Sequence, residues 1–188
     1  MITMLVAIAL QNGLAQNTQR RVSKLGVYLI DPGKGQLPST VSFKNTIPPV
    51  TLESERELLP VFSLGTEFGI ARWDVGVSGV PSSRSSEDFK NTLWSFWGGL
   101  KGVAHFKVAN IVEPYVQMTI GYGKVMVTSN NDDYNNALSR NGLNNVGGTY
   151  KAFAAGANIY ISDNFGIYGE AGLKESKGLF KVGVVFKR

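Results

Sequence analysis

The segment that decides the fold is Phe165-Gly-Ile-Tyr-Gly-Glu-Ala-Gly-Leu173, near the carboxyl end of the chain. Its odd-numbered positions carry apolar or small side chains, whereas the even positions carry Tyr168 and Glu170, with a glycine on either side of this pair. A period of two residues is typical of a β-strand with two unlike faces. Phe180–Phe186 repeats this pattern, with Lys181 on the face opposite its apolar residues. The two segments predict a pair of antiparallel strands.

The connection between these two strands predicts their register. Lys174-Glu175-Ser176-Lys177 has the length of a tight turn. With a two-residue turn at Glu175-Ser176, Glu170 lies directly opposite Lys181 on the same face of the hairpin. The sequence therefore predicts a cross-strand ion pair between these two side chains.

Period-two alternation extends back through most of the chain. It predicts eight strands, at about residues 22–30, 60–70, 73–81, 92–106, 113–128, 149–162, 165–173 and 178–187. No amphipathic stretch of convincing helical length interrupts them, so the predicted fold class is all-β.

The predicted connections alternate in length. The long ones span residues 31–59, 82–91 and 129–148, and the short ones are Ala71-Arg72, residues 107–112 and Asp163-Asn164. Long loops on one side and short turns on the other are typical of outer-membrane barrels, whose short turns face the periplasm. We therefore expect an eight-stranded antiparallel up-and-down transmembrane β-barrel with both termini on the periplasmic side. The short last connection departs from the alternation.

Composition excludes several function classes. Among 188 residues there is no Cys, one His and 22 Gly, and only 18% of the residues are charged. The absence of Cys excludes disulfides, thiolate metal sites and cysteine nucleophiles. We expect no catalytic residues, no metal site and no cofactor. The net charge is +5, but the basic residues are scattered, so nucleic acid is not an expected partner.

The amino terminus has the features of an export signal. Met1–Leu10 is an uncharged apolar run, too short to span a bilayer as a helix. Gly13 and Ala15 suit signal peptidase, so residues 1–15 are predicted to be a signal peptide, although a basic n-region is missing. The alternative is a buried amino-terminal strand or helix. Residues 16–188 then form a single barrel domain.

The closing strands carry a resemblance to a known family. Tyr160–Leu173 (YISDNFGIYGEAGL) and Gly178–Lys187 (GLFKVGVVFK) resemble the last strands of small OmpA/OmpX-type outer-membrane β-barrels. The resemblance implies a location in the outer membrane of a Gram-negative-type cell and insertion by the barrel-assembly machinery. That machinery reads a terminal aromatic residue, whereas here Phe186 is followed by Lys187 and Arg188. The family hosts adhesins, structural anchors and a few enzymes, so it implies no single activity.

The two faces of the strands sort the side chains into lipid-facing and lumen-facing sets. In a membrane barrel the apolar face points outward. The predicted outward set includes aromatic residues for the two membrane interfaces: Trp73, Trp94, Phe106, Tyr122, Phe165 and Phe186. The predicted lumen charge network consists of Lys24, Glu67, Asp74, Lys101, Glu170 and Lys181. We interpret it as a structural plug, because eight strands leave room only for side chains; the alternative is a proton or ion path.

Surface positions supply the candidate binding residues. Lys124 and Lys151 break the apolar face near its outer rim, where they suit the phosphates of lipopolysaccharide, or are simply solvated lysines. In the loop 129–148, Asp132-Asp133 has oxygens for Ca²⁺, but the spacing favours a flexible polar loop. Tyr134 and Leu138 are candidate contacts for a partner protein. Loops usually carry function on rigid scaffolds, so loops 31–59 and 129–148 are the expected partner sites.

The expected function is therefore structural or surface-binding, through adhesion or a partner protein, and not enzymatic. His105 is predicted to be a hydrogen-bonding lumen residue, and Ser63, Ser78 and Ser95 lack a histidine partner for a catalytic triad. An outer-membrane lipid-modifying enzyme is the second hypothesis. A soluble lipocalin-like carrier is the third, and it would require an apolar lumen and a charged exterior.

Overall fold

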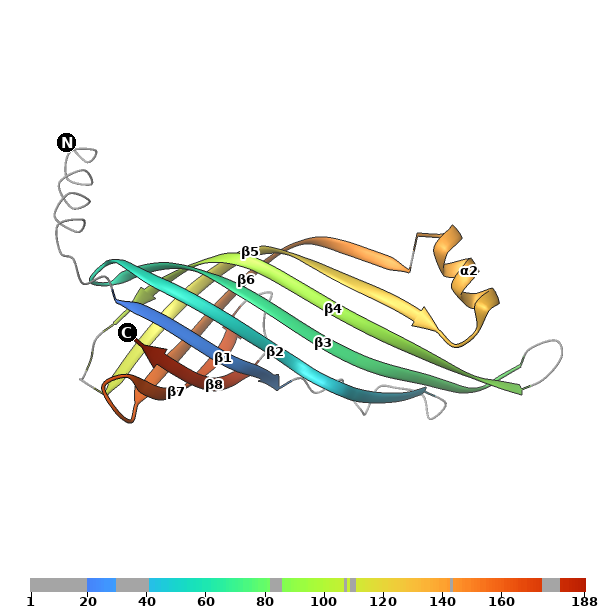
Figure 1. Ribbon diagram of the computed structural model, residues 1–188, viewed down its shortest axis with the longest axis horizontal. Helices are drawn as coiled ribbons and strands as arrows, with labels where there is room; N and C mark the ends of the chain where they lie inside the picture. The colour runs from blue at the N-terminus through green and yellow to red at the C-terminus, as the bar shows by residue number, and fades with distance from the viewer. Residues whose placement is uncertain are drawn as a thin grey trace, which may run out of the picture.

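The computed structural model describes residues 20–29, 41–81, 86–106, 108, 111–142, 144–173 and 180–188. Within these ranges lie β1 (Arg21–Leu29), β2 (Val41–Leu59), β3 (Phe62–Pro81), β4 (Ser86–His105), β5 (Val112–Ser129), α2 (Asp132–Arg140), β6 (Asn145–Tyr160), β7 (Phe165–Leu173) and β8 (Phe180–Lys187). Each strand pairs antiparallel with the next, and β8 pairs with β1 (Figure 1). The predicted closed eight-stranded up-and-down barrel is confirmed.

The hairpin of β7 and β8 closes the barrel in the predicted register. Glu170 lies opposite Lys181, and the next strand along, β1, pairs with β8 so that Gly26 faces Gly183. These glycines leave room for a lumen aromatic ring, because a Cβ at Gly26 would lie 2.0 Å from the Tyr168 hydroxyl oxygen. The strand pairing at the seam is therefore coupled to the packing of the interior.

The first half of the chain corrects the predicted strand boundaries. Residues 41–59, predicted to belong to a long loop, form β2, and the two predicted strands 60–70 and 73–81 are one continuous strand, β3. The tight turn lies at Pro60 and Val61 rather than at Ala71-Arg72, and Ala71 is fully buried within β3. The count of eight strands was right, but the predicted assignment of its second and third members was wrong.

Strand β2 escaped detection because its pattern is not apolar. Its inward side carries Glu53 and Glu55, and its outward side carries polar residues beside Leu52. Pro48 and Pro49 also indicated a loop. In the barrel they lie at register shifts against β3, beyond the residues of β2 that pair with β1, where a missing amide donor breaks no ladder on that side.

The predicted flexible loop 129–148 contains the helix α2, which is a second correction. Asn135 ties its first turn to the end of β5, because the Ser129 amide donates to Asn135 Oδ1 at 2.7 Å and Asn135 Nδ2 donates to the Ser129 carbonyl. Asp132 lies in the first turn and Arg140 in the last, as the helix dipole favours. Gly142 follows with a φ of 66°, a left-handed conformation that often ends a helix.

The two ends of the barrel differ. The short connections 60–61, 106–111 and 161–164 lie at the end where the start of β1 meets the carboxyl terminus, since the Arg21 amide donates to the Arg188 carbonyl. We call this the terminus end, and the opposite one the loop end. At the loop end β2 to β5 extend well beyond the shorter β1, β7 and β8 (Figure 1). The predicted signal peptide, residues 1–15, lies outside the described residues.

The distribution of polarity is the reverse of that in a soluble protein. Large apolar side chains point outward from every described strand, among them Leu25, Phe68 (60% exposed), Leu100 (71% exposed), Ile120, Ile167 and Val182. Among the described residues, the interior instead holds nine buried lysine, glutamate and histidine side chains, of which Lys24, Lys101 and Lys181 are each only 1% exposed. This is the arrangement of a transmembrane barrel, with an apolar band toward lipid and a polar lumen. Among the described residues, no helix is long and apolar enough to cross a membrane.

Candidate functional site

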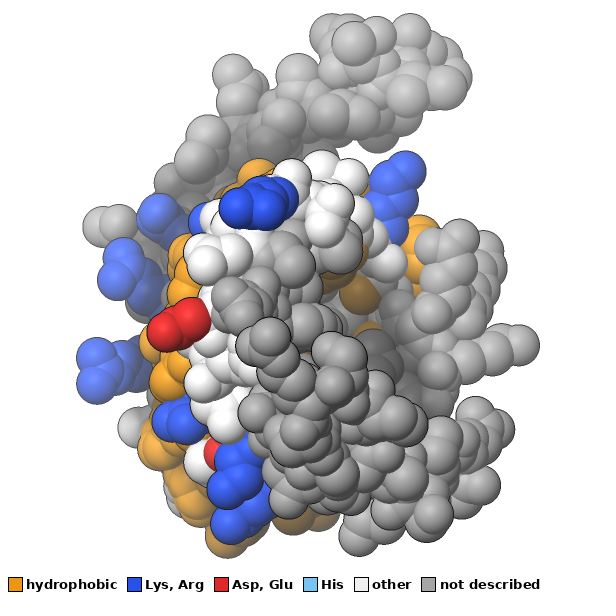
Figure 2. All heavy atoms as spheres, turned by 90° about the vertical axis from the view of Figure 1, so that its right-hand side faces the viewer, with side chains coloured by type: hydrophobic (Ala, Val, Ile, Leu, Met, Phe, Trp, Pro, Cys, Tyr) orange, Lys and Arg blue, Asp and Glu red, His pale blue; other side chains and the backbone are white. Residues whose placement is uncertain are grey.

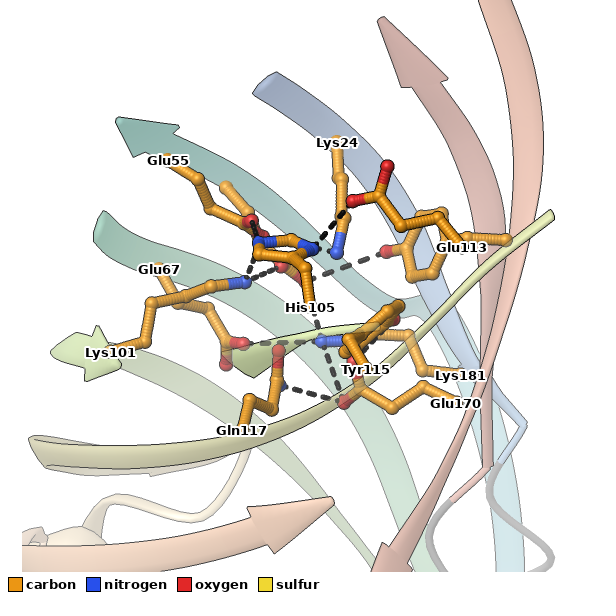
Figure 3. A network of polar contacts seen from close by, with 12 residues as sticks. Lys24, Glu55, Glu67, Lys101, His105, Glu113, Tyr115, Gln117, Glu170 and Lys181 are labelled. Carbon is orange, nitrogen blue, oxygen red and sulfur yellow. Dashed lines mark hydrogen bonds and ion pairs between the residues drawn. The ribbon is translucent and has the colours of Figure 1, made fainter. Parts of the chain in front are cut away.

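A network of charged side chains crosses the lumen between the terminus end and the middle of the barrel and is drawn in Figure 3. The structure brings together five of the six residues predicted for it: Lys24, Glu67, Lys101, Glu170 and Lys181. They come from β1, β3, β4, β7 and β8, so the network crosses the whole width of the barrel. Charges removed from water must be paired to be tolerated, and each of these side chains has a partner of opposite charge.

Lys181 is the ion-pairing centre of the half nearer the loop end. Its Nζ lies 2.5 Å from Glu53 Oε1, 3.2 Å from Glu67 Oε2 and 3.1 Å from Glu170 Oε1. Glu170, the cross-strand partner expected from the sequence, also accepts hydrogen bonds of 3.0 Å from Tyr115 and Gln117. One ammonium group thus serves three carboxylates.

Lys101 and Lys24 form the next layer, toward the terminus end. Lys101 contacts both Glu53 and Glu55, and Lys24 Nζ lies 3.0 Å from Glu55 Oε1. The Lys24 ammonium also lies 3.8 Å from the centre of the Tyr115 ring, a cation–π contact. A buried aromatic ring therefore supplements the carboxylates in stabilising this lysine.

His105 closes the network at the terminus end. Its Nδ1 lies 2.6 Å from Glu113 Oε1, and its Nε2 lies 3.4 Å from Glu55 Oε2. The guanidinium of Arg20 reaches the other oxygen of Glu113 at 2.6 Å and donates to the Tyr160 hydroxyl at 2.5 Å. Both ring nitrogens of His105 therefore face carboxylates, and neither faces a serine, so the residue has no geometry for a catalytic triad.

The charges of the network balance when His105 is protonated. The buried carboxylates are Glu53, Glu55, Glu67, Glu113 and Glu170, and the permanent cations beside them are Arg20, Lys24, Lys101 and Lys181. An imidazolium at His105 supplies the fifth positive charge and a donor to each neighbouring carboxylate. The site is thus an almost neutral plug whose parts hold one another in place.

Sequence reasoning missed the acids of β2 and β5. Glu53 and Glu55 fell in a segment predicted to be a loop, and Glu113 stood at the edge of a predicted strand. The signal that would have found the first two is the spacing of Glu53, Glu55 and Glu57, which repeats acids with the period of a strand. A charged face with that period indicates a lumen when the other strands are apolar outward.

Asp74 and Trp73 are the two predicted site residues on the wrong face, because β3 does not turn at residue 71. Asp74 lies outside the lumen, where it accepts hydrogen bonds from Thr46 at 2.9 Å and Thr92 at 3.1 Å and pairs with Arg72. Trp73 lines a cavity inside the barrel instead of joining the exterior aromatic residues. Val75 shares this inward face by the alternation of the strand.

The other five aromatic residues predicted for the interfaces lie on the exterior. Phe106, Phe165 and Phe186 are at the terminus end, where the last two rings pack with centroids 5.4 Å apart. Trp94 and Tyr122 are nearer the loop end, and Trp94 stacks on Phe96 at 6.0 Å. The Arg72 guanidinium lies 5.3 Å from the Trp94 ring centre, which places a cation within this upper aromatic group.

The predicted surface-binding residues lie apart from the plug. Lys124 and Lys151 are on the exterior of β5 and β6, but they are not direct neighbours, since Lys124 pairs with Gly147 and Lys151 with Ile120. Asp132 lies in the first turn of α2, and Tyr134 and Leu138 also belong to this helix. Among the described residues, no group of three or more His, Asp or Glu is placed to hold a metal ion.

The closed barrel, its apolar exterior and its charged lumen define the class of fold: a small eight-stranded transmembrane β-barrel. Solved structures of outer-membrane proteins share it. OprG from Pseudomonas aeruginosa is 9% identical, with a TM-score of 0.54 over 91% of this chain and 96% of that one. Ail of Yersinia pestis, crystallised with the heparin analogue sucrose octasulfate, is 12% identical, with a TM-score of 0.50 over 90% and 99% of the two chains.

These similarities confirm, at the level of the fold, the resemblance to small outer-membrane barrels carried by the closing strands. No protein-family model and no curated protein matches the sequence.

Proposed function

We propose that the chain is an integral outer-membrane protein that presents a binding surface on its loop end, for adhesion or for a partner protein. The observation that carries the proposal is the reversed polarity of the barrel. Exterior side chains such as Phe68 and Leu100 would be unfavourable in water and are favourable against lipid. A lumen of paired charges provides the internal stability that an apolar core provides elsewhere.

The proposed orientation puts the terminus end in the periplasm and the loop end outside the cell. The two-residue turn at Pro60 and Val61 and the connections 106–111 and 161–164 have the lengths usual for periplasmic turns. The connection that carries α2 is the longest between described strands, and extracellular loops are usually the long ones.

The filled lumen favours a binding role over the conduction of solutes. Lys101 and Lys181 cross the interior with fully buried side chains. A cavity inside the network has a volume of only about 20 Å³, which is room for about one water molecule. A solute would have to separate several ion pairs in order to pass.

The chemistry of the loop end suits anionic partners. Figure 2 looks onto this end, and more blue than red side chains are seen on it. Lys44, Lys90 and Arg140 are exposed there, and Lys124 and Lys151 lie on the lipid-facing side. We assign the last two to the phosphates of lipopolysaccharide. The complex of Ail with the heparin analogue sucrose octasulfate supports the idea that a barrel of this shape can bind an anionic ligand.

The carboxyl-terminal strand is the proposed recognition element for the barrel-assembly machinery. Phe186 points outward from β8 and packs on Phe165, so its ring is available on the lipid side of the seam. Lys187 and Arg188 follow it at the terminus end.

We propose no enzymatic activity. His105 is the one histidine of the chain, and both of its ring nitrogens face carboxylates inside the plug. It lies at the terminus end of β4, far along the barrel from the loop end, where the lipopolysaccharide of the outer leaflet would meet the protein.

Single cysteines test the location and the orientation, because the native chain has none. We expect Asn136→Cys, exposed on α2, to react with a membrane-impermeant maleimide on intact cells. Asp163→Cys, exposed in the connection from β6 to β7, should react only after the outer membrane is permeabilised. Labelling of Asp163→Cys alone on intact cells would reverse the orientation. If cell fractionation recovers the protein in the soluble fraction instead of the membrane fraction, the membrane location is refuted.

The binding role is tested on cells that display the protein. We expect adhesion to a heparin-coated surface to fall when the exposed cations of the loop end, Lys44, Lys90 and Arg140, are replaced by glutamine. The same replacement of Arg21, Arg56 and Arg188, exposed at the terminus end, is the matched control. Equal adhesion by all three proteins would exclude the cations of the loop end as the binding element.

A further inference from the structure

The loop end of the lumen contains a cavity that the charge network does not fill. Its volume is about 290 Å³, and four aromatic side chains contribute to its wall: Tyr28, Trp73, Trp97 and Tyr150. Glu67 is the acidic group of the lining. Hydrophobic side chains are visible inside the mouth in Figure 2. An engineered cavity of about 150 Å³ in another protein binds benzene, so this one has room for a small organic molecule.

Two glycines make room for the aromatic wall. A Cβ at Gly69 would lie 2.1 Å from the indole ring of Trp97, and a Cβ at Gly121 would lie 2.7 Å from the ring of Tyr150. The two rings therefore lie directly against the backbones of β3 and β5. Glycines at these two positions allow the rings to lie flat against the strands, and the position of the rings determines the shape of the cavity.

Glu67 lies at the boundary between the cavity and the charge network. Its Oε1 accepts a hydrogen bond of 3.2 Å from Trp97 Nε1 and a longer contact of 3.4 Å from the Tyr28 hydroxyl. Its Oε2 lies 3.2 Å from Lys181, which is also 2.5 Å from Glu53. The carboxylate is thus oriented from the cavity wall but is only one of three acids that share this lysine.

The local charge favours a cation over an anion. The cation beside Glu67 is Lys181, which is shared among three carboxylates, those of Glu53, Glu67 and Glu170, so it does not neutralise Glu67 alone. The wall itself supplies no lysine or arginine.

The aromatic wall favours the same kind of ligand. Ring faces attract ammonium groups, and rings that surround such a group form the usual recognition site for alkylated amines. The lumen already uses this contact, since Lys181 Nζ lies 5.2 Å from the centre of the Tyr28 ring. The Tyr150 hydroxyl is buried without a hydrogen-bond partner among the described residues.

We propose that this cavity binds a small organic cation, an alkylammonium whose charged head lies among the four aromatic rings and against Glu67. This inference goes beyond the proposed surface-binding role and does not depend on it. The ligand would enter from the loop end and stop at the plug formed by Lys181 and its carboxylates. The cavity would therefore act as a receptor site and not as one stage of a pore.

Tryptophan fluorescence gives a direct test, because two of the three tryptophans line the cavity. Trp94→Phe removes the third, which is on the exterior, and leaves Trp73 and Trp97 as reporters. The full chain in a non-ionic detergent is titrated with choline, and in parallel with its uncharged isostere 3,3-dimethylbutan-1-ol. We expect a saturable change with choline and a response to the alcohol that is weaker by about ten-fold or more.

A matched pair of variants separates the site from general electrostatics. Glu67→Gln should weaken choline binding by about ten-fold or more, because it removes the charge against which the ammonium rests. Glu170→Gln removes an equal charge from the same lysine but does not line the cavity. It should change the affinity by less than about three-fold, since it acts only through the shared lysine. If Glu67→Gln fails to fold, Tyr150→Leu removes one ring of the wall, and the lost cation–π attraction should weaken choline binding by about three-fold or more. Unchanged binding would contradict recognition by the rings.

Several outcomes would overturn the proposal. Equal affinities for choline and the alcohol would make the cavity a site for neutral apolar molecules. Equal losses of choline affinity in Glu67→Gln and Glu170→Gln would mean that the charge network attracts the cation at long range and that Glu67 does not contact it. The absence of any saturable response in a protein with native circular dichroism and heat-modifiable gel mobility would exclude a ligand of this class. None of these results affects the cysteine labelling. The proposed membrane orientation and the proposed cation site can therefore be refuted independently.

Discussion

The two ends of the lumen show two ways of filling the same barrel. At the terminus end, Arg20, His105 and Glu113 join Lys24 and Glu55 in contacts of 2.6 to 3.4 Å. At the loop end, aromatic rings surround a cavity of about 290 Å³. Buried charges must be paired at short range, so a complete network closes the lumen. Four rings and Glu67 line the space at the loop end without filling it, so the aromatic half keeps space for a ligand.

The largest expected effect is the loss of the lysine between the two halves. Lys181→Met leaves Glu53, Glu67 and Glu170 without their shared cation, and we expect the free energy of unfolding to fall by about 3–5 kcal/mol. Lys90→Met is the matched control on the exposed part of β4 and should stay within about 0.5 kcal/mol of the parent. Urea titration in lipid vesicles measures both. Similar losses in the two variants would mean that the network contributes little to stability.

A double-mutant cycle at the terminus end tests the proposed charge balance. His105→Gln and Glu113→Gln should each cost about 1–3 kcal/mol, because each leaves a buried charge with one partner fewer. The double variant removes one charge of each sign, so its loss should be smaller than the sum by about 0.5–3 kcal/mol. Additive losses would show that His105 is not a cation in the folded barrel.

Gly69→Ala addresses the aromatic half alone. The added methyl group collides with Trp97 at 2.1 Å, and overpacking of this kind typically costs about 1–3 kcal/mol. The same variant should lose the fluorescence response to choline. Gly148→Ala is the control, since a Cβ there meets nothing within 4 Å. If both variants keep the response, Trp97 does not shape the site.

The smallest effect is expected outside the lumen, at α2. Asn135→Ala removes the hydrogen bonds that join the helix to Ser129, and we expect a local loss of about 1 kcal/mol. Amide hydrogen exchange should accelerate about five-fold within α2 and remain unchanged in the strands. Acceleration in the strands as well would mean that the helix and the barrel unfold together.

The same contrast explains which features could be predicted. The hairpin of β7 and β8 was readable to the level of the Glu170–Lys181 pair, because apolar and polar residues alternate strictly and the turn is short. Strand β2 could not be predicted in this way, because Glu53 and Glu55 resemble surface residues in the sequence. Their partners, Lys101 and Lys181, belong to β4 and β8. A hydropathy pattern uses only the residues of one strand, whereas the ion pairs of these acids depend on strands far away in the sequence.

A single misplaced turn accounts for the two predicted site residues that lie on the wrong face of the barrel, Trp73 and Asp74. The predicted break at Ala71-Arg72 inverted the faces of everything that follows in β3, since a shift of one residue exchanges inside and outside. Asp74 was therefore assigned to the lumen and Trp73 to the exterior, and each lies on the other side. The lumen cavity could not be recognised while one of its rings was assigned to the lipid face.

By itself, the sequence determined the architecture: an all-β barrel with apolar outward faces, a set of inward charges and a closing hairpin in known register. Those properties depend on local alternation of apolar and polar residues, which most strands carry in their own residues and β2 does not. Only the tertiary structure decided which charges meet, that both nitrogens of His105 face carboxylates, and that four rings from β1, β3, β4 and β6 surround one cavity. Closure of the barrel sets those contacts, because it brings together side chains that no local pattern relates.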